Sequence, residues 1–349
     1  MRTATELPDI SGVVSRGGLI DLGVSERRLR TAVQRTEILR LSEGHYISGD
    51  EWDSLDPWGR LRARTLAFAG AASPSSIVCG WSALALHRVP DVATPAPTPS
   101  LIRRKWGTSG SDRTTYGYVR NCVPPDEAIT QVEGILVLEK GFAMADLVRS
   151  TGRLTSLIVA DAIATDPAAA EGMAQSLTTL RKWPRFPRSE WLVRTTDPLS
   201  ESPLESAGRF RALQAGLPIP ISNAWLGPGY PERRVDLWWE RFALAAEADG
   251  AVKYLVDPAR AVALQHARQG SLEELGIRFV RYDWRGAFRH PAELAARFSA
   301  ALDAARPPLS RALRWWPCQE GWAIRRGDVS VEECPGRTVP PASDRIVFR

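Results

Sequence analysis

This chain of 349 residues is poor in cysteine, histidine and lysine. Its four cysteines form no C-x-x-C pair and its four histidines lie far apart, so the sequence lacks the spacing of a zinc site or of a disulfide framework. Such cysteine usage favours a reduced, cytoplasmic protein. Lysine occupies only four positions, and arginine therefore carries nearly all of the positive charge.

Long hydrophobic runs are also lacking. No uncharged run is long enough to span a bilayer, and Asp9 and Arg16 interrupt the N-terminal residues, which therefore lack the apolar core of a secretory signal. We expect no membrane partner. The composition, with 44% hydrophobic and 24% charged residues, is that of a globular protein with room for two or three domains. The net charge of +5 mildly favours a polyanionic partner.

Residues 8–50 have the pattern of two short helices followed by a hairpin. Ser15 and Ser25 are suitable N-caps for the two helices, and Gly23 suits the turn between them. Two short apolar runs on either side of Gly44 predict the two strands of the hairpin. This order of elements is that of a winged helix, in which the second helix enters the major groove of DNA.

Arginines surround the second of these helices and continue into the hairpin. They are candidates for contacts with the phosphate backbone of DNA. The DNA-binding candidates are Arg27, Arg28, Arg30, Arg35 and Arg40. A winged helix that serves only protein–protein contacts is the alternative, and the arginines favour DNA.

The rest of the chain divides into three segments. Residues 57–183 predict a small α+β connector with no chemical signature, followed by a boundary region rich in proline and arginine at 181–203. Residues 200–305 have the order α-β-β-β-α-β-α, with a helix expected from Asp257 onward, and this order predicts a mixed sheet flanked by helices. Residues 306–349 form a tail rich in proline and arginine that either wraps onto the body or stays loose. The expected fold class is thus α+β with several domains.

Four acidic residues fall on neighbouring elements of the 200–305 segment. Glu205 begins its first helix, Asp236 lies in one strand, and Glu247 and Asp249 lie in the next, with Lys253 just beyond. Carboxylates within strands are costly unless a cation offsets their charge. Adjacent antiparallel strands can bring Asp236 beside Glu247, and Mg²⁺ or Mn²⁺ between them would polarise a scissile phosphate.

Each of these residues also has a purely structural interpretation. Glu205 can complete a capping box with Ser202, and Asp236 can pair with one of the arginines at 233 and 234. Asp249 and the following glycine are an ordinary turn pair, and Lys253 alone is a solvated lysine. Glu247 is the hardest to dismiss, because its neighbours are apolar. Similarly, the tryptophan pairs at 238–239 and 315–316 can stack on bases or belong to the core.

The 200–305 segment, which carries these acidic residues, resembles the endonuclease-like domain related to very-short-patch repair (Vsr) nucleases, of the PD-(D/E)XK superfamily. The similarity covers about residues 200–305 and rests on the runs Ser202-Pro-Leu-Glu205, Arg234-Val-Asp236, Glu247-Ala-Asp249-Gly250, Lys253-Tyr254 and Gly276-Ile-Arg-Phe-Val-Arg281. It implies a mixed α/β restriction-endonuclease-like fold. It also implies that Asp236 and Glu247 are the metal ligands, Glu205 the helix carboxylate and Asp249 an accessory acid. The superfamily usually has lysine where this chain has Asp249, and Lys253 is the candidate replacement.

The N-terminal segment resembles the winged-helix domain of AbiEi-type antitoxins, the transcription-regulating partners of type IV toxin–antitoxin systems. The matching runs are Gly17-Gly-Leu, Val24-Ser25, Leu29-Arg30, Leu39-Arg40-Leu41 and Gly44-His-Tyr-Ile47. The connector is similar to the segment that accompanies both parts in actinobacterial proteins of this layout.

Two functions follow from these patterns. The first is a DNA-binding protein with a Mg²⁺-dependent endonuclease-like domain. Its catalytic candidates are Glu205, Asp236, Glu247, Asp249 and Lys253. The second is an antitoxin-like transcriptional regulator whose nuclease fold is catalytically degenerate, with a toxin gene or operator as its partner.

Overall fold

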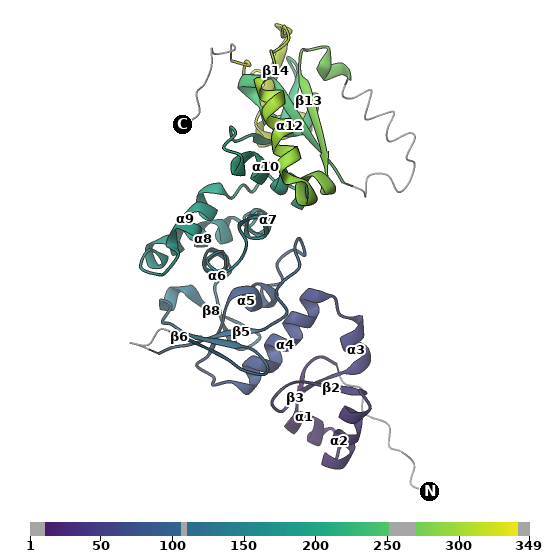
Figure 1. Ribbon diagram of the computed structural model, residues 1–349, viewed down its shortest axis with the longest axis vertical. Coiled ribbons are helices and arrows are strands. Elements are labelled where there is room, and N and C mark those ends of the chain that lie inside the picture. The colour runs from purple at the N-terminus through teal and green to yellow at the C-terminus, as the bar shows by residue number, and fades with distance from the viewer. Residues whose placement is uncertain (1–10, 106–109, 251–269, 341–349) are drawn as a thin grey trace. The chain divides into compact units, whose positions relative to one another are not determined.

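The computed structural model describes residues 11–105, 110–250 and 270–340. The chain divides into two compact units, Met1–Thr196 and Asp197–Arg349 (Figure 1). The described residues form helices and three sheets, which confirms the expected mixed α+β class. The border between the units falls inside the boundary region predicted at 181–203, although that region also contains a helix, α9 (Phe186–Thr195).

The first unit begins with the two helices and the hairpin that the sequence predicts. Its elements are β1 (Val14–Ser15), α1 (Arg16–Asp21), α2 (Glu26–Gln34), β2 (Ile38–Ser42) and β3 (His45–Ser48), with strand order β1-β3-β2. The Ser15 hydroxyl accepts a hydrogen bond from the Gly18 N–H at 3.1 Å, and Ser25 caps α2 through the Arg28 N–H at 3.3 Å. Gly44 takes a left-handed conformation, with φ of +68°, in the turn between β2 and β3.

The remainder of the first unit is a six-stranded sheet followed by a group of helices. The helices before and within the sheet are α3 (Gly49–Ser54), α4 (Pro57–Ala71), α5 (Gly80–Leu86) and the 3₁₀ helix η1 (Asp126–Ala128). The sheet has the order β6 (Gly110–Arg113), β7 (Tyr118–Asn121), β5 (Ser100–Arg103), β4 (Ile77–Val78), β9 (Ile135–Leu138) and β8 (Ile129–Val132). The chain continues through α6 (Lys140–Leu147), α7 (Arg153–Ile163), α8 (Pro167–Leu180) and α9.

A buried carboxylate lies where this sheet meets α6. Asp146 is 3% exposed, and both Arg120 and Arg149 form ion pairs with it. The two guanidinium groups also lie over the ring of Trp183, at 5.7 and 5.1 Å from its centroid. The charge of Asp146 is therefore neutralised from two sides, which is the condition under which a buried carboxylate is tolerated.

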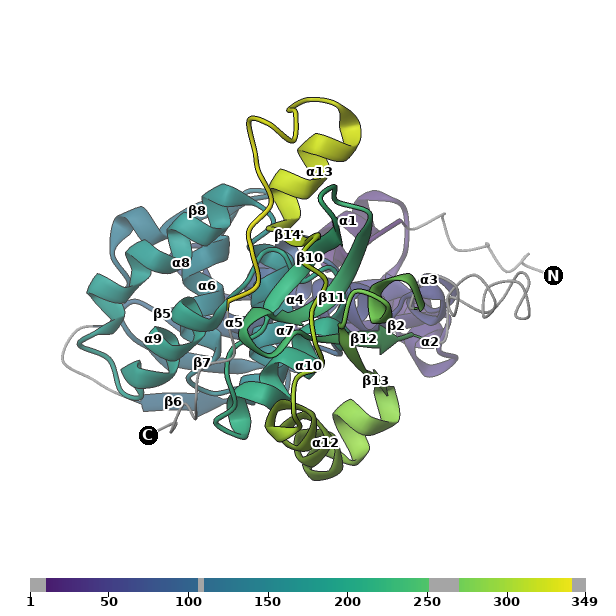
Figure 2. The ribbon, with the colours of Figure 1, turned by 90° about the horizontal axis from the view of Figure 1, so that it is seen from above.

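The second unit is built on a five-stranded sheet. Its strand order is β13 (Arg278–Asp283), β12 (Leu244–Asp249), β11 (Arg233–Trp239), β10 (Ile221–Pro228) and β14 (Leu313–Trp316). The pair β12–β13 is parallel and the other pairs are antiparallel. The helical elements are α10 (Pro203–Gln214), η2 (Glu240–Phe242), the π-helix η4 (Arg285–Arg289), α12 (Pro291–Asp303) and α13 (Cys318–Arg326). Figure 2 shows α12 and α13 on opposite sides of the strands. The helix predicted from Asp257 lies mainly outside the described residues.

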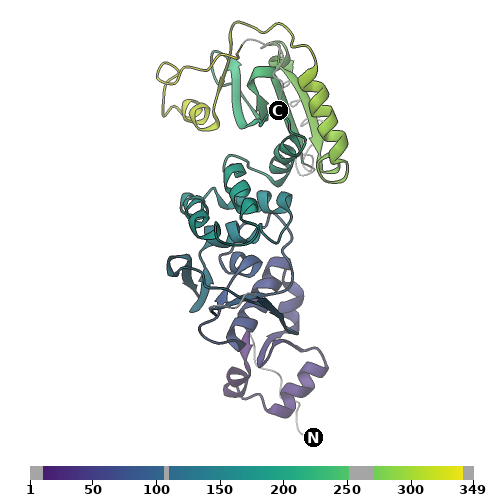
Figure 3. The same cartoon turned by 60° about the vertical axis from the view of Figure 1, so that its left-hand side comes forward.

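The tail predicted at 306–349 is partly integrated into this sheet. Within it, β14 pairs with β10, where Trp316 lies opposite Trp225, and α13 packs beside the same strand (Figure 3). Trp316 is fully buried and Trp315 is 4% exposed. Burial of these large rings stabilises the packing of the segment against the sheet. Of the two alternatives for the tail, wrapping onto the body is therefore correct for residues 313–326.

Candidate functional site

The sheet of the second unit brings four polar residues to one level of adjacent strands. Glu247 on β12 is the register partner of Arg281 on β13. The neighbouring pairs of the β11–β12 ladder place Asp236 opposite Glu247, and those of the β10–β11 ladder place Asn223 opposite Asp236. The predicted proximity of Asp236 and Glu247 therefore agrees with the strand register.

Asp236 lies where β11 and β12 stop pairing through their backbones. Its Oδ2 atom accepts a hydrogen bond from the backbone N–H of Ala248 at 2.7 Å, so a side chain replaces the carbonyl that a regular ladder would supply. The two arginines at 233 and 234, which are the alternative partners of Asp236, both lie near other carboxylates. Arg234 binds Glu201 through two contacts of 2.6 Å, and Arg233 lies 3.5 Å from Glu232.

Glu205 is both a helix-capping residue and a neighbour of Asp236. Its backbone N–H donates to Ser202 at 3.2 Å, as the capping interpretation predicts. Its carboxylate accepts hydrogen bonds from the Ser202 hydroxyl at 2.8 Å, from the Glu201 N–H at 3.0 Å and from the Asn223 amide at 2.8 Å. Burial raises the pKa of Glu205, and the negative charge of Asp236 raises it further. The two interpretations of Glu205 are thus compatible.

Asn223 and Tyr282 belong to this site but carried no signal in the sequence. Asn223 is 1% exposed and has a φ of +54° within a strand, a conformation that asparagine tolerates better than most residues. The buried hydroxyl of Tyr282 donates to the carbonyl of Leu204 at 3.3 Å. Burial, and then the charges of Asp236, Glu205, Glu247 and Asp249, raise the pKa of Tyr282 well above its ordinary value. We call these four carboxylates the acid cluster, because all of them act on this one phenol.

Asp249, one member of the acid cluster, forms an ion pair with an arginine. Arg281 donates from Nε to Asp249 Oδ2 at 2.9 Å, and its Nη2 contacts the second oxygen, so the pair is bidentate. Both side chains are partly exposed, at 31% and 24%. Such a planar pair fixes the carboxylate in place. The interpretation of Asp249 as an ordinary turn residue therefore omits its main interaction.

The donor set of the acid cluster suits a cation with few protein ligands. Within the described residues, no group of three or more His, Cys, Asp or Glu side chains is arranged to hold a metal ion. Mg²⁺ typically keeps several waters and binds one or two carboxylates together with substrate phosphates. Asp236 and Glu247, opposite each other on adjacent strands, meet that smaller requirement. Lys253 lies outside the described residues.

The predicted DNA-binding arginines do not form a single group. Arg27, Arg30 and Arg35 are exposed on α2 and just after it. Arg28 forms an ion pair with Glu37 at 2.9 Å, and Arg35 lies 3.9 Å from the same residue. Arg40 lies apart from them on β2.

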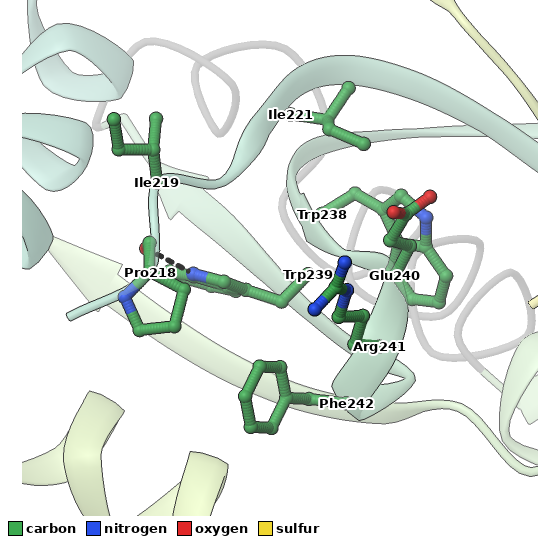
Figure 4. Close-up of a pocket in the computed structure, with 8 residues that line it drawn as sticks. All are labelled: Pro218, Ile219, Ile221, Trp238, Trp239, Glu240, Arg241 and Phe242. Atoms are coloured by element: carbon green, nitrogen blue, oxygen red, sulfur yellow. Dashed lines mark hydrogen bonds between the residues drawn. The ribbon is translucent and has the colours of Figure 1, made fainter. Parts of the chain in front are cut away.

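A hollow at the end of β11 shares no residue with the acid cluster (Figure 4). It encloses about 240 Å³ and is lined by Pro218, Ile219, Ile221, Trp238, Trp239, Glu240, Arg241 and Phe242. The Trp239 indole donates to the Pro218 carbonyl at 2.7 Å. Trp238 and Trp239 are 0% and 2% exposed. Both therefore belong to the core, and the base-stacking interpretation of this pair is wrong.

Every helix among the described residues is too short or too polar to cross a membrane. A scan against models of known protein families finds no match to this chain. A search of curated proteins likewise finds no match.

Proposed function

We propose that this chain is a cytoplasmic DNA-binding protein with a Mg²⁺-dependent endonuclease domain. In this proposal the N-terminal helices and hairpin form a winged helix of the AbiEi antitoxin type, and the second unit is a restriction-endonuclease-like domain related to Vsr nucleases. Mn²⁺ is the alternative metal. DNA is the partner.

The observation that carries the proposal is the convergence of like charges from three elements. Glu205 comes from α10, Asp236 from β11 and Glu247 from β12, and the charge of Asp236 raises the pKa of Glu205. Carboxylates that repel one another in this way are typical of sites that hold a cation or perform acid–base chemistry.

The residues then have distinct roles. Asp236 and Glu247 would hold the metal, which would supply Lewis-acid chemistry at a scissile phosphate. Glu205, fixed by Ser202 and Asn223, adds a negative charge near Asp236. Arg281 holds Asp249 beside the site through their bidentate pair.

Contact with DNA is assigned to α2 and its surroundings. Arg27 and Arg30 extend from the exposed side of a helix whose apolar residues Leu29 and Ala32 are buried in the local core. Arginines on the exposed face of such a helix reach phosphates and base edges in the major groove. Arg28 and Arg35, which interact with Glu37, would contribute less.

The test is a nicking assay on supercoiled plasmid with Mg²⁺ or Mn²⁺. We expect the purified chain to nick DNA, and Asp236→Asn to reduce the rate at least about 100-fold, because even residues that only support metal ligands cost 10–100-fold. Glu293→Gln, which removes an exposed carboxylate of α12, serves as the matched control and should cut normally. Undiminished cutting by Asp236→Asn would exclude the proposed metal ligand.

The second candidate is a transcriptional regulator in which the nuclease fold is a degenerate binding platform. Two observations favour it: Arg281 neutralises the acid at the position of the usual catalytic lysine, and three hydrogen bonds already occupy the Glu205 carboxylate. A mobility-shift titration against the DNA upstream of the gene separates the two functions. Tight, sequence-specific binding without cleavage in either metal supports the regulator, and weak binding with metal-dependent cutting supports the nuclease.

A further inference from the structure

The first unit contains a pocket that is rich in arginine and has no acidic lining residue. It encloses about 460 Å³ and is lined by residues of β2, α3, α4, β6 and the loops beside them. Its three charged residues are Arg40, Arg64 and Arg113. We call this hollow the arginine pocket. Three like charges facing one hollow repel one another, and an anion bound between them would offset that repulsion.

Aromatic rings orient two of these arginines. The Arg64 guanidinium lies 4.9 Å from the centroid of the Trp52 ring and donates to the Pro97 carbonyl at 3.2 Å. The Arg40 guanidinium lies 5.8 Å from the centroid of the Tyr116 ring. A guanidinium has five N–H donors, so one hydrogen bond to a carbonyl leaves most of the Arg64 fork available for a ligand.

The chemistry of the arginine pocket matches a phosphate group. Planar guanidinium forks bind phosphate oxygens in bidentate fashion, and an arginine stacked on a ring loses less freedom when it does so. Arg113 is exposed at the end of β6, and Thr98 and Thr115 also line the pocket.

We propose that the arginine pocket binds a backbone phosphate of duplex DNA, and that the middle of the first unit is therefore part of the DNA interface. This inference rests on the proposed DNA-binding function. Arg40 belongs to the hairpin that directly follows α2, so a duplex contacted by α2 and the hairpin would continue toward Arg64 and Arg113. In this proposal the connector, which has no chemical signature in the sequence, contributes Arg64 and Arg113 to DNA binding.

The experiment is a fluorescence-anisotropy titration of the full chain with duplex DNA over a series of salt concentrations. We expect Arg113→Ala to weaken binding at low salt and to reduce the slope of log K against log salt by about 0.9, the value for one lost phosphate contact. Arg181→Ala, which removes an exposed arginine at the end of α8, is the matched control and should leave the slope unchanged. An unchanged slope for Arg113→Ala would overturn the proposal.

Three outcomes distinguish failure of this proposal from failure of the proposed function. If Arg30→Ala weakens binding and Arg113→Ala does not, the arginine pocket is not a DNA site, although the protein still binds DNA. If the wild type binds no duplex DNA, the proposed function itself fails. Binding of inorganic pyrophosphate that Arg113→Ala abolishes, without any change in DNA affinity, would assign the pocket to a small phosphate and overturn the proposal.

Discussion

The two units each contain a buried carboxylate, and the charged groups near these two carboxylates have opposite signs. In the first unit, Asp146 is 3% exposed and has an arginine on each of two sides. In the second, Glu205 is 8% exposed, and the charged neighbour that shifts its pKa is another carboxylate, Asp236. Both residues are buried to a similar degree, so burial alone does not distinguish their two environments.

The difference lies in the sign of the neighbouring charges. The charge of an acid enclosed by arginines is compensated in the folded state, and removing that acid leaves the arginines with uncompensated buried charge. Acids that face one another raise the energy of the fold in the absence of a cation, and such an arrangement is typical of a functional site. Three experiments test this contrast.

The largest effect is expected from Asp146→Ala. The substitution leaves Arg120 and Arg149 without their carboxylate in a buried setting, and removal of one partner from a buried ion pair costs about 3–5 kcal/mol. Urea denaturation followed by circular dichroism measures the loss in the free energy of unfolding. Asp126→Ala is the control, because it breaks an exposed ion pair with Arg104 and should leave this free energy unchanged. An equally small loss for Asp146→Ala would remove the contrast.

An intermediate effect is expected from Mg²⁺ on thermal stability. A cation that binds only the folded state stabilises it by about 2.7 kcal/mol at 100 times its Kd, and Tm should rise accordingly. Asp236→Asn should abolish this rise and Asp146→Asn should not. Differential scanning calorimetry with and without Mg²⁺ provides the measurement. A rise of the same size in Asp236→Asn would show that the cation binds elsewhere.

The smallest effect is the pH dependence that Glu205 contributes. Because its pKa is raised in the folded state, folding favours the protonated form, so this contribution to stability is complete at low pH and is lost as pH rises through the raised pKa. Glu205→Gln does not titrate and should therefore show a shallower decline in stability above pH 4.5, the ordinary pKa of a glutamate. Urea unfolding at a series of pH values compares the two proteins. Parallel curves would mean that burial and the charge of Asp236 do not raise the pKa of Glu205.

Local patterns predicted a large part of this fold. The capping serines, the glycine turn at Gly44 and the alternation along β11 and β12 depend on residues close in sequence, and the structure contains the corresponding elements. Adjacent antiparallel strands can bring Asp236 beside Glu247, and the register of the β11–β12 ladder agrees with that expectation.

The interactions that the sequence did not predict join distant segments. The pair of Asp249 with Arg281 spans 32 residues, and Asn223 reaches Glu205 across 18. The strand β14 has only four residues, and its partner β10 lies far before it in the chain. Such contacts depend on how the elements pack, and neither periodicity nor capping patterns contain that information.

The position of β14 has a consequence for synthesis of the protein. The ribosome delivers β14 after the other four strands of its sheet, so the outer side of β10, with Trp225, has no partner strand until then. An uncovered strand edge is a template for pairing with another chain. Nascent chains that stall before Leu313 should therefore self-associate during translation, and the acid cluster would be completed on a sheet that is still open on one side.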